Sequence, residues 1–139
     1  MITLPGSCHC GQLRVVFETE FAPEALPVRA CTCSFCVRHT PRYTTDRSGR
    51  LIFEIGEPAF TSRYRFHLQS ADFLVCARCG VFVGATMPDE GGALAVVNLN
   101  VLEARDRFVQ RVEVMDLGAE DLEARITRRR GRWTPAVLR

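Results

Sequence analysis

Short stretches in which hydrophobic and polar residues alternate recur along this chain. Leu13–Glu18 places Leu13, Val15 and Phe17 on one face. Leu51–Ile55 is a short apolar run before a Gly-Glu-Pro turn, and Arg63–His67 alternates strictly. A period of two is typical of a strand with one buried face. The other face of the last stretch is basic and consists of Arg63, Arg65 and His67. The pattern therefore predicts three strands in the first half of the chain.

A hairpin and two further strands are predicted in the second half. Phe73–Val75 and Val81–Val83 are hydrophobic runs on either side of a Cys-x-x-Cys pair, so we expect this pair at the tip of a hairpin. Turn-forming residues at Met87–Gly92 precede two more strand-like stretches, Ala93–Leu99 and Arg107–Met115. Most of the chain is therefore predicted to be β.

Two segments are predicted to be loops. Phe21–Pro27 contains two prolines and leads into a short extended stretch at Val28–Ala30. Val37–Arg50 is mostly polar. We therefore expect it to form a loop beside the cysteines that precede it. Substrate-binding groups often lie on loops of this kind, held by a rigid scaffold.

One helix is predicted near the C-terminus. Its apolar face would consist of Ala119, Leu122 and Ile126. Asp121 and Arg125 have the spacing of an i,i+4 ion pair. Arg128–Arg132 follows, and such a basic run at a helix end is usually a solvated face that complements the helix dipole, while Trp133–Pro135 closes the segment. Together the pattern predicts a mainly β single domain over residues 1–139 with a short C-terminal helix.

Composition narrows the classes of function. The chain has 139 residues, 47% of them hydrophobic, and no apolar run of the roughly 18 residues that span a bilayer, so we expect a cytoplasmic protein without a membrane partner. All 18 basic residues are arginine, yet the net charge is only +2. Guanidinium groups suit small acidic ligands, although genomic composition explains the arginine usage at least as well. A pI of 8.2 argues against a nucleic-acid partner.

The cysteines carry the strongest chemical signal. Cys31, Cys33 and Cys36 lie within six residues, and three thiol ligands with one open position are typical of a catalytic metal site. The other four form two pairs, each followed by glycine, at Cys8/Cys10 and Cys76/Cys79. Four thiolates in two pairs are typical of a closed structural zinc site. A split of four and three uses all seven thiols, and we favour it over other groupings.

Other uses of the cysteines fit less well. The odd count and the absence of a signal-like N-terminus argue against disulfides, and adjacent Cys-x-Cys thiols bridge poorly. A redox Cys-x-x-Cys motif would account for one pair only. Such motifs normally lie near a βαβ pattern, which the sequence around Cys76 does not show. Among the nearby histidines, His9 is interpreted as a turn residue. His39 could act as an acid or base, or close the trio as a fourth ligand, but a solvated loop residue is the favoured interpretation.

These motifs resemble a known family. Gly6-Ser-Cys-His-Cys-Gly11, Cys31-x-Cys33-Ser34-x-Cys36 and Cys76-x-x-Cys79-Gly80 are similar to the signature of the glutathione-dependent formaldehyde-activating enzyme (GFA) family, which includes the centromere protein V domain. The resemblance covers nearly the whole chain. It implies a fold of stacked antiparallel β-sheets, a structural zinc on Cys8, Cys10, Cys76 and Cys79, and a catalytic zinc on Cys31, Cys33 and Cys36.

The resemblance also implies a chemistry. A zinc-dependent carbon–sulfur lyase would act on the adduct of a small aldehyde with glutathione, the possible co-substrate, or a similar thiol. Arg38, Arg42, Arg63 and Arg65 are candidates to bind the carboxylates of such a thiol. The chain departs from the family pattern at Thr32, where members often carry histidine, and at His39–Tyr43, which replaces a segment of small residues. Both departures lie beside the open metal position and bear on the substrate.

Two other classes remain open. A zinc-stabilised binding module without turnover would need only the four-thiol site, so metal content separates it from an enzyme. A zinc-ribbon nucleic-acid binder would use Arg128–Arg132, but the low net charge disfavours it. We expect a monomer or a homodimer.

Overall fold

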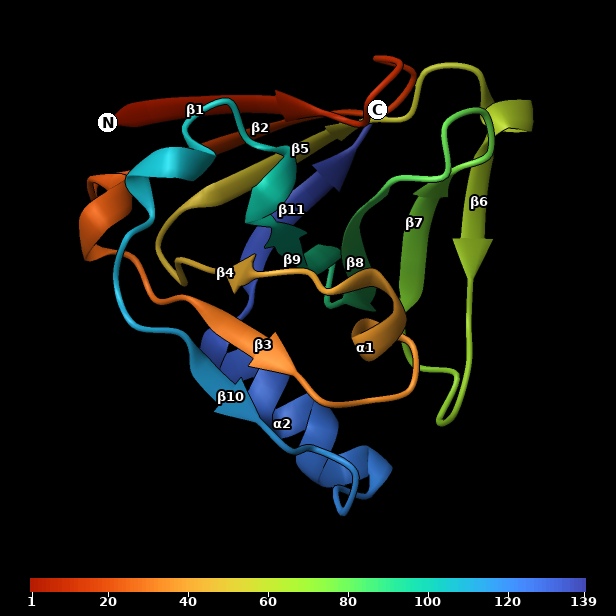
Figure 1. Cartoon of the computed structure of the whole chain (residues 1–139). Coiled ribbons are helices and arrows are strands. Elements are labelled where there is room, and N and C mark those ends of the chain that lie inside the picture. The colour runs from red at the N-terminus through yellow and green to blue at the C-terminus, as the bar shows by residue number, and fades with distance from the viewer.

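The computed structural model describes all residues, Met1–Arg139, and the predicted mainly β architecture with a short C-terminal helix is confirmed (Figure 1). The strands are β1 (Ile2–Ser7), β2 (Arg14–Thr19), β3 (Arg29–Cys31), β4 (Tyr43–Thr44), β5 (Arg50–Glu54), β6 (Thr61–Tyr64), β7 (Asp72–Cys76), β8 (Phe82–Asp89), β9 (Gly92–Asn98), β10 (Glu113–Met115) and β11 (Thr134–Leu138). The α-helices are α1 (Cys36–His39) and α2 (Leu122–Arg132). Short 3-10 helices lie at Pro23–Ala25, Pro58–Phe60, Leu99–Val101 and Arg105–Arg107.

Hydrogen bonds join all the strands into one branched sheet. From β1 the order runs β2, β5, β11 and β9, and at β9 the sheet divides into β4-β3-β10 and β8-β7-β6. Most pairs are antiparallel, but β11 pairs with β5 and β10 with β3 in parallel. The last strand of the chain therefore lies in the middle of the sheet, between β5 and β9 (Figure 1). Neither helix has the length and apolar character needed to cross a membrane.

Two buried clusters fill the space around the sheet. Alternation in β2 points Val15 and Phe17 into the larger cluster, which also contains the buried thiols of Cys8 and Cys76. The smaller cluster includes Cys36, Tyr43, Phe82 and Trp133. Each group of cysteines is thus anchored in a different part of the hydrophobic core.

The structure corrects several predicted bounds. Only Glu113–Met115 of the stretch Arg107–Met115 is a strand, because β3 offers just three residues for pairing. The predicted turn at Met87–Gly92 is shorter, since β8 continues to Asp89. The strand predicted at Arg63–His67 has different bounds in the structure, because β6 ends at Tyr64 and the backbone at His67 turns with a φ of 54°.

The segment Val37–Arg50 is not a loop throughout. It contains most of α1 and all of β4, and the stretch from Tyr43 to Asp46 is buried. One of its charged groups is bound inside the protein: the buried Asp46 accepts hydrogen bonds from Thr19 Oγ1 at 2.6 Å and from the Ser48 N–H at 3.0 Å. Polar composition here reflects satisfied buried groups as well as solvent exposure.

The C-terminal helix also differs in detail from its prediction. Asp121 is the N-cap of α2 and accepts a hydrogen bond from the Ala124 N–H at 2.8 Å, so it does not pair with Arg125. Arg128–Arg132 forms the last turns of the helix instead of following it, and Trp133 leads directly into β11. Arg129 is only 6% exposed. The prediction that this run is a solvated face is therefore wrong for Arg129, whereas Arg130 and Arg132 are exposed.

Candidate functional site

The four paired cysteines come together from two hairpin tips. Cys8 and Cys10 lie between β1 and β2, whereas Cys76 is the last residue of β7 and Cys79 lies in the turn before β8. Their four Sγ atoms lie within 4.8 Å of one another, with 3.8 Å between Cys8 and Cys10 and 3.6 Å between Cys10 and Cys76. Zinc–sulfur bonds of about 2.3 Å give a regular tetrahedron with edges of about 3.8 Å. The group therefore has the donor chemistry and size for one zinc ion.

Backbone N–H groups are already directed at these sulfurs. The Leu13 N–H donates to Cys8 Sγ at 3.2 Å, and the Arg78 N–H donates to Cys76 Sγ at 3.4 Å. The turns close through Gly11 and Gly80, which have φ values of 83° and 80°. Glycine adopts positive φ without steric cost, so these residues let each loop turn directly after its ligand pair. Such N–H groups stabilise thiolate sulfur, the form that binds a metal.

The three remaining cysteines form a separate group between β3 and α1. The Sγ atoms of Cys31, Cys33 and Cys36 lie within 4.8 Å of one another, and the group contains no fourth Cys, His, Asp or Glu. The Cys33 N–H donates to Cys31 Sγ at 3.4 Å, and the Cys36 N–H donates to Cys33 Sγ at 3.3 Å. Tyr43 Oη lies 3.1 Å from Cys36 Sγ. Three sulfur donors with these supporting contacts fit a zinc ion that keeps one position for a ligand.

The pKa values of two thiols, one in each group, are shifted in opposite directions. Hydrogen bonding to the Cys36 thiol lowers the pKa of Cys31 to about 6, so one member of the trio is a thiolate at neutral pH. Burial raises the pKa of Cys8 to about 11. A divalent ion supplies the positive charge that keeps such a buried thiol deprotonated.

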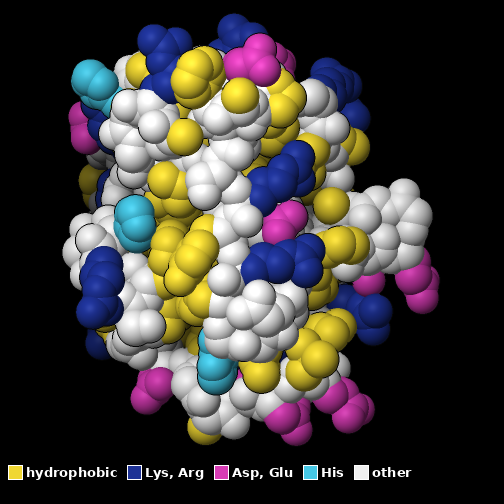
Figure 2. All heavy atoms as spheres, turned by 90° about the vertical axis from the view of Figure 1, so that its right-hand side faces the viewer, with side chains coloured by type: hydrophobic (Ala, Val, Ile, Leu, Met, Phe, Trp, Pro, Cys, Tyr) yellow, Lys and Arg dark blue, Asp and Glu magenta, His cyan; other side chains and the backbone are white.

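Aromatic side chains cover one side of the trio. Phe35 stacks on His39 with ring centroids 4.5 Å apart and on Phe66 at 5.3 Å, and Phe66 packs against Phe73 at 4.7 Å. His39 is held by this stacking and is not part of the sulfur group, so it does not close the trio. Figure 2 shows the face over β6 and β7, where hydrophobic side chains gather between charged groups.

A cavity of about 340 Å³ adjoins the trio. Cys31, Cys33 and Cys36 line it together with aromatic residues that include Phe66, Phe73 and Trp133. Five guanidinium groups also line it, those of Arg29, Arg125, Arg128, Arg129 and Arg132. One chamber therefore combines a potential metal centre, apolar walls and a concentration of positive charge.

The arginines predicted from the sequence lie outside this cavity. Arg38 Nη1 donates to the Ser34 carbonyl at 2.7 Å, and Arg42 Nε donates to Asn100 Oδ1 at 2.8 Å. Arg63 and Arg65 both pair with Asp72, at 3.7 Å and 2.6 Å. The protein's own oxygens hold these four guanidinium groups, and the structure does not bring them together at the trio.

The cavity arginines of α2 could have been found from their spacing. Arg125, Arg128, Arg129 and Arg132 follow the i, i+3, i+4, i+7 pattern of one helical face. This pattern is usually sought among hydrophobic residues, and a basic run was interpreted as solvated. Arg29, on β3, carries no such local signal.

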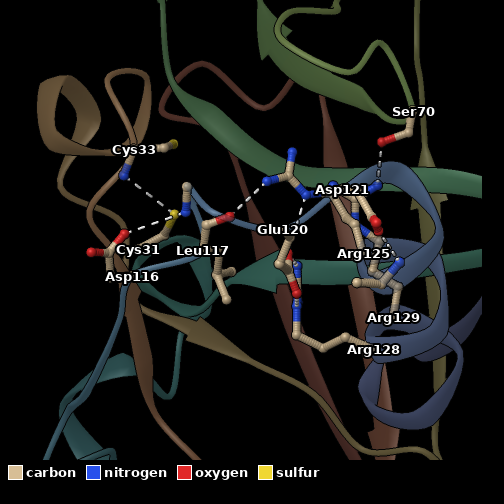
Figure 3. A network of polar contacts seen from close by, with 12 residues as sticks. Cys31, Cys33, Ser70, Asp116, Leu117, Glu120, Asp121, Arg125, Arg128 and Arg129 are labelled. Carbon is tan, nitrogen blue, oxygen red and sulfur yellow. Dashed lines mark hydrogen bonds and ion pairs between the residues drawn. The ribbon is translucent and has the colours of Figure 1, made fainter.

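Glu120 organises two of these arginines (Figure 3). Its carboxylate accepts hydrogen bonds from Arg125 Nε at 3.2 Å and from Arg128 Nε at 2.8 Å, and Arg125 also donates to the Leu117 carbonyl at 2.9 Å. The three charged side chains are largely buried, with exposed fractions between 12% and 17%. Glu120 thus fixes the guanidinium groups at the edge of the cavity.

We expect Glu120→Gln to lower the free energy of unfolding by about 1.5–3 kcal/mol at pH 7, because it removes charge-assisted hydrogen bonds to two arginines. Burial raises the pKa of Glu120, but hydrogen bonds from Arg128 and Arg125 outweigh it and lower this pKa. A lowered folded pKa means that the stabilisation is present above the unfolded pKa of about 4.3 and disappears as the pH falls through the folded value. Urea unfolding of the wild type and the variant at pH 7 measures the loss of stability, and the same comparison at pH 3 shows whether the difference disappears.

The matched control is Glu123→Gln, because Glu123 lies exposed in the first turn of the same helix. It should change stability by less than about 0.5 kcal/mol at either pH. Equal losses for the two variants at pH 7 would contradict the role given to Glu120.

Comparisons with known proteins identify the family. The model of the glutathione-dependent formaldehyde-activating enzyme family matches residues 3–115, which include all seven cysteines. The structure is similar to the crystal structure of a protein from Rhodobacter sphaeroides, with a TM-score of 0.58 and 25% sequence identity over 80% of this chain and 99% of that one. A comparison with curated proteins gave no match. The family match ends before α2, but it spans both groups of thiols, and the chain belongs to the glutathione-dependent formaldehyde-activating enzyme family.

Proposed function

We propose that this protein is a zinc-dependent enzyme that makes or breaks a carbon–sulfur bond in the adduct of a small aldehyde with glutathione or a similar thiol. The observation that carries the proposal is the trio of thiols, which has no fourth protein donor and lines a cavity. In the direction of synthesis the thiol sulfur bonds to the aldehyde carbon, and the thiol proton ends on the aldehyde oxygen. The product is a hemithioacetal.

Cys31, Cys33 and Cys36 would hold the zinc ion, which when bound lowers the pKa of a ligand thiol and polarises a carbonyl. Three thiolates reduce this Lewis acidity, because they donate more charge than histidines. The five cavity arginines offset that excess of negative charge. Phe66 and Phe73 line the cavity beside the trio and give it an apolar wall on one side.

Seven free thiols are compatible with a reducing compartment, and we propose that the protein works in the cytoplasm, where glutathione is abundant. The test of the activity is direct. Zinc-loaded protein is added to ¹³C-formaldehyde and glutathione, and exchange between free and thiol-bound carbon is followed by NMR. We expect exchange faster than the spontaneous reaction. A rate equal to the spontaneous one for a series of small aldehydes would overturn the proposal.

Tyr43→Phe should weaken metal binding or turnover at the trio by roughly 10- to 100-fold, as is usual when a partner of a metal ligand is lost. Burial, together with the neighbouring Cys36 thiol, raises the pKa of Tyr43 well above its ordinary value, so its hydroxyl stays protonated. A metal-bound Cys36 thiolate can only accept, so Tyr43 Oη, 3.1 Å away, would donate to it. Competition for zinc against a chelator measures affinity, and the NMR exchange assay measures turnover.

The control is Tyr64→Phe, which removes a hydroxyl from an exposed ring of the neighbouring aromatic cluster. This variant should match the wild type in both assays. An unchanged Tyr43→Phe variant would show that the hydroxyl contributes only packing.

A further inference from the structure

Arg129, which is buried, and Arg29, which is half-buried, each have one guanidinium nitrogen without a hydrogen-bond partner beside the cavity. Arg129 is 6% exposed, and its Nη1 donates to Ser70 Oγ at 2.8 Å, but its Nε is buried without a partner. Arg29 Nη1 donates to Thr45 Oγ1 at 2.9 Å, and its buried Nε is also without one. Buried charged donors are normally satisfied, because desolvation without compensation is costly. The chain therefore leaves the charge of these two guanidinium groups incompletely compensated.

The carboxylates nearby do not supply that acceptor. Glu120 is engaged by Arg125 and Arg128, and Glu113 stays 3.9 Å from Arg29 Nε, which is beyond hydrogen-bond length. Arg129 forms no ion pair with any carboxylate of the chain. The wall formed by β3 and α2 thus keeps an excess of positive charge that an anionic ligand can neutralise.

The orientation of Arg129 is fixed before any ligand binds. Its guanidinium carbon lies 4.5 Å from the ring centroid of Trp133, in a cation–π contact, and Ser70 holds the other side. A guanidinium held in this way binds a carboxylate at a lower cost in side-chain entropy than a mobile surface arginine.

We infer that Arg29 and Arg129, supported by Arg125, Arg128 and Arg132, form a carboxylate-binding subsite that selects acidic ligands and directs their other end toward Cys31, Cys33 and Cys36. As a statement about the reacting ligand, this rests on the proposed function. The cavity of about 340 Å³ suits a small molecule. The family match ends at residue 115, so the family assignment does not extend to the arginines of α2.

The carboxylate could belong to the thiol or to the aldehyde, and two pairs of probes separate these sources. Glutathione is compared with its diethyl ester, and glyoxylate with its methyl ester, by calorimetric titration of the zinc-loaded protein without turnover. We expect the acid of at least one pair to bind roughly 10- to 100-fold more tightly than its ester, as charge-assisted hydrogen bonds imply. The pair that shows the difference identifies the source. Equal binding of acid and ester in both pairs overturns the inference.

Substitutions locate the subsite. Arg129→Gln should remove most of the preference for the acid, whereas Arg130→Gln should leave it unchanged, because Arg130 pairs with Asp89 and does not line the cavity. If Arg129→Gln fails to fold by circular dichroism, Arg29→Gln provides the same test from β3. Equal losses for Arg130→Gln and the tested cavity variant, or no loss in the latter, overturn the inference. Selective binding without any lyase turnover would remove the proposed function and leave the subsite standing.

Discussion

Cys76→Ser should prevent this chain from folding. Cys76 is fully buried in the larger core, and its Sγ lies 3.6 Å from Cys10 Sγ across 66 residues of sequence. An ion held there closes a long loop as well as satisfying buried thiolates, and structural zinc in small domains contributes roughly 10 kcal/mol or more. That matches or exceeds the net stability of about 5–15 kcal/mol typical of a folded protein. Circular dichroism and the soluble yield should show the loss.

The matched control is Ala77→Ser. It places the same hydroxyl one position further along an exposed turn and leaves all four sulfurs in place. This variant should fold and retain its zinc, measured by plasma mass spectrometry. A soluble Cys76→Ser protein with a native spectrum and cooperative unfolding would show that the four-thiol group does not hold the fold together.

Features determined by local chemistry could be predicted from the sequence. The spacing within Cys76–Cys79, the following Gly80 and the flanking hydrophobic runs act over a few residues, so the hairpin tip follows from the chain itself. The grouping of four and three thiols was also predictable, because metal sites use ligands in sets of defined size. The mainly β class followed from short alternating runs.

Features determined by long-range packing could not be predicted from the sequence. β11 lies between β5 and β9, and no local pattern in Thr134–Leu138 specifies either neighbour. The same placement brings Trp133 under Arg129 and turns one face of α2 toward the cavity. Arg129, which would be solvated on an isolated helix, is buried here because the next strand places Trp133 against it. The sequence therefore indicated the two cysteine groups, but not that the arginines of α2 line the same cavity as the trio.

Cys33→Ser should leave the fold intact and abolish the function of the trio. The three thiols span only six residues, so a metal bound there closes a short loop and contributes little to folding compared with the four-thiol group. Cys33 is half-buried and lies at the edge of the smaller core. We expect a native circular dichroism spectrum, a fall from two zinc ions per chain to one, and a loss of aldehyde–thiol exchange greater than about a hundredfold, because altering mere partners of metal ligands already costs roughly 10- to 100-fold.

The control for this variant is Val37→Ala, an exposed position on α1 that carries no ligand and does not line the cavity. It should keep both ions and full exchange activity. Three results bear on the division between the two groups. Unfolding of Cys33→Ser to the same extent as Cys76→Ser would show that the trio is a second structural site. One zinc per chain in the wild type would favour a binding module held by the four-thiol group alone. Two ions in the wild type, with the second removable by a chelator without unfolding, would support a metal at the trio that serves chemistry and not the scaffold.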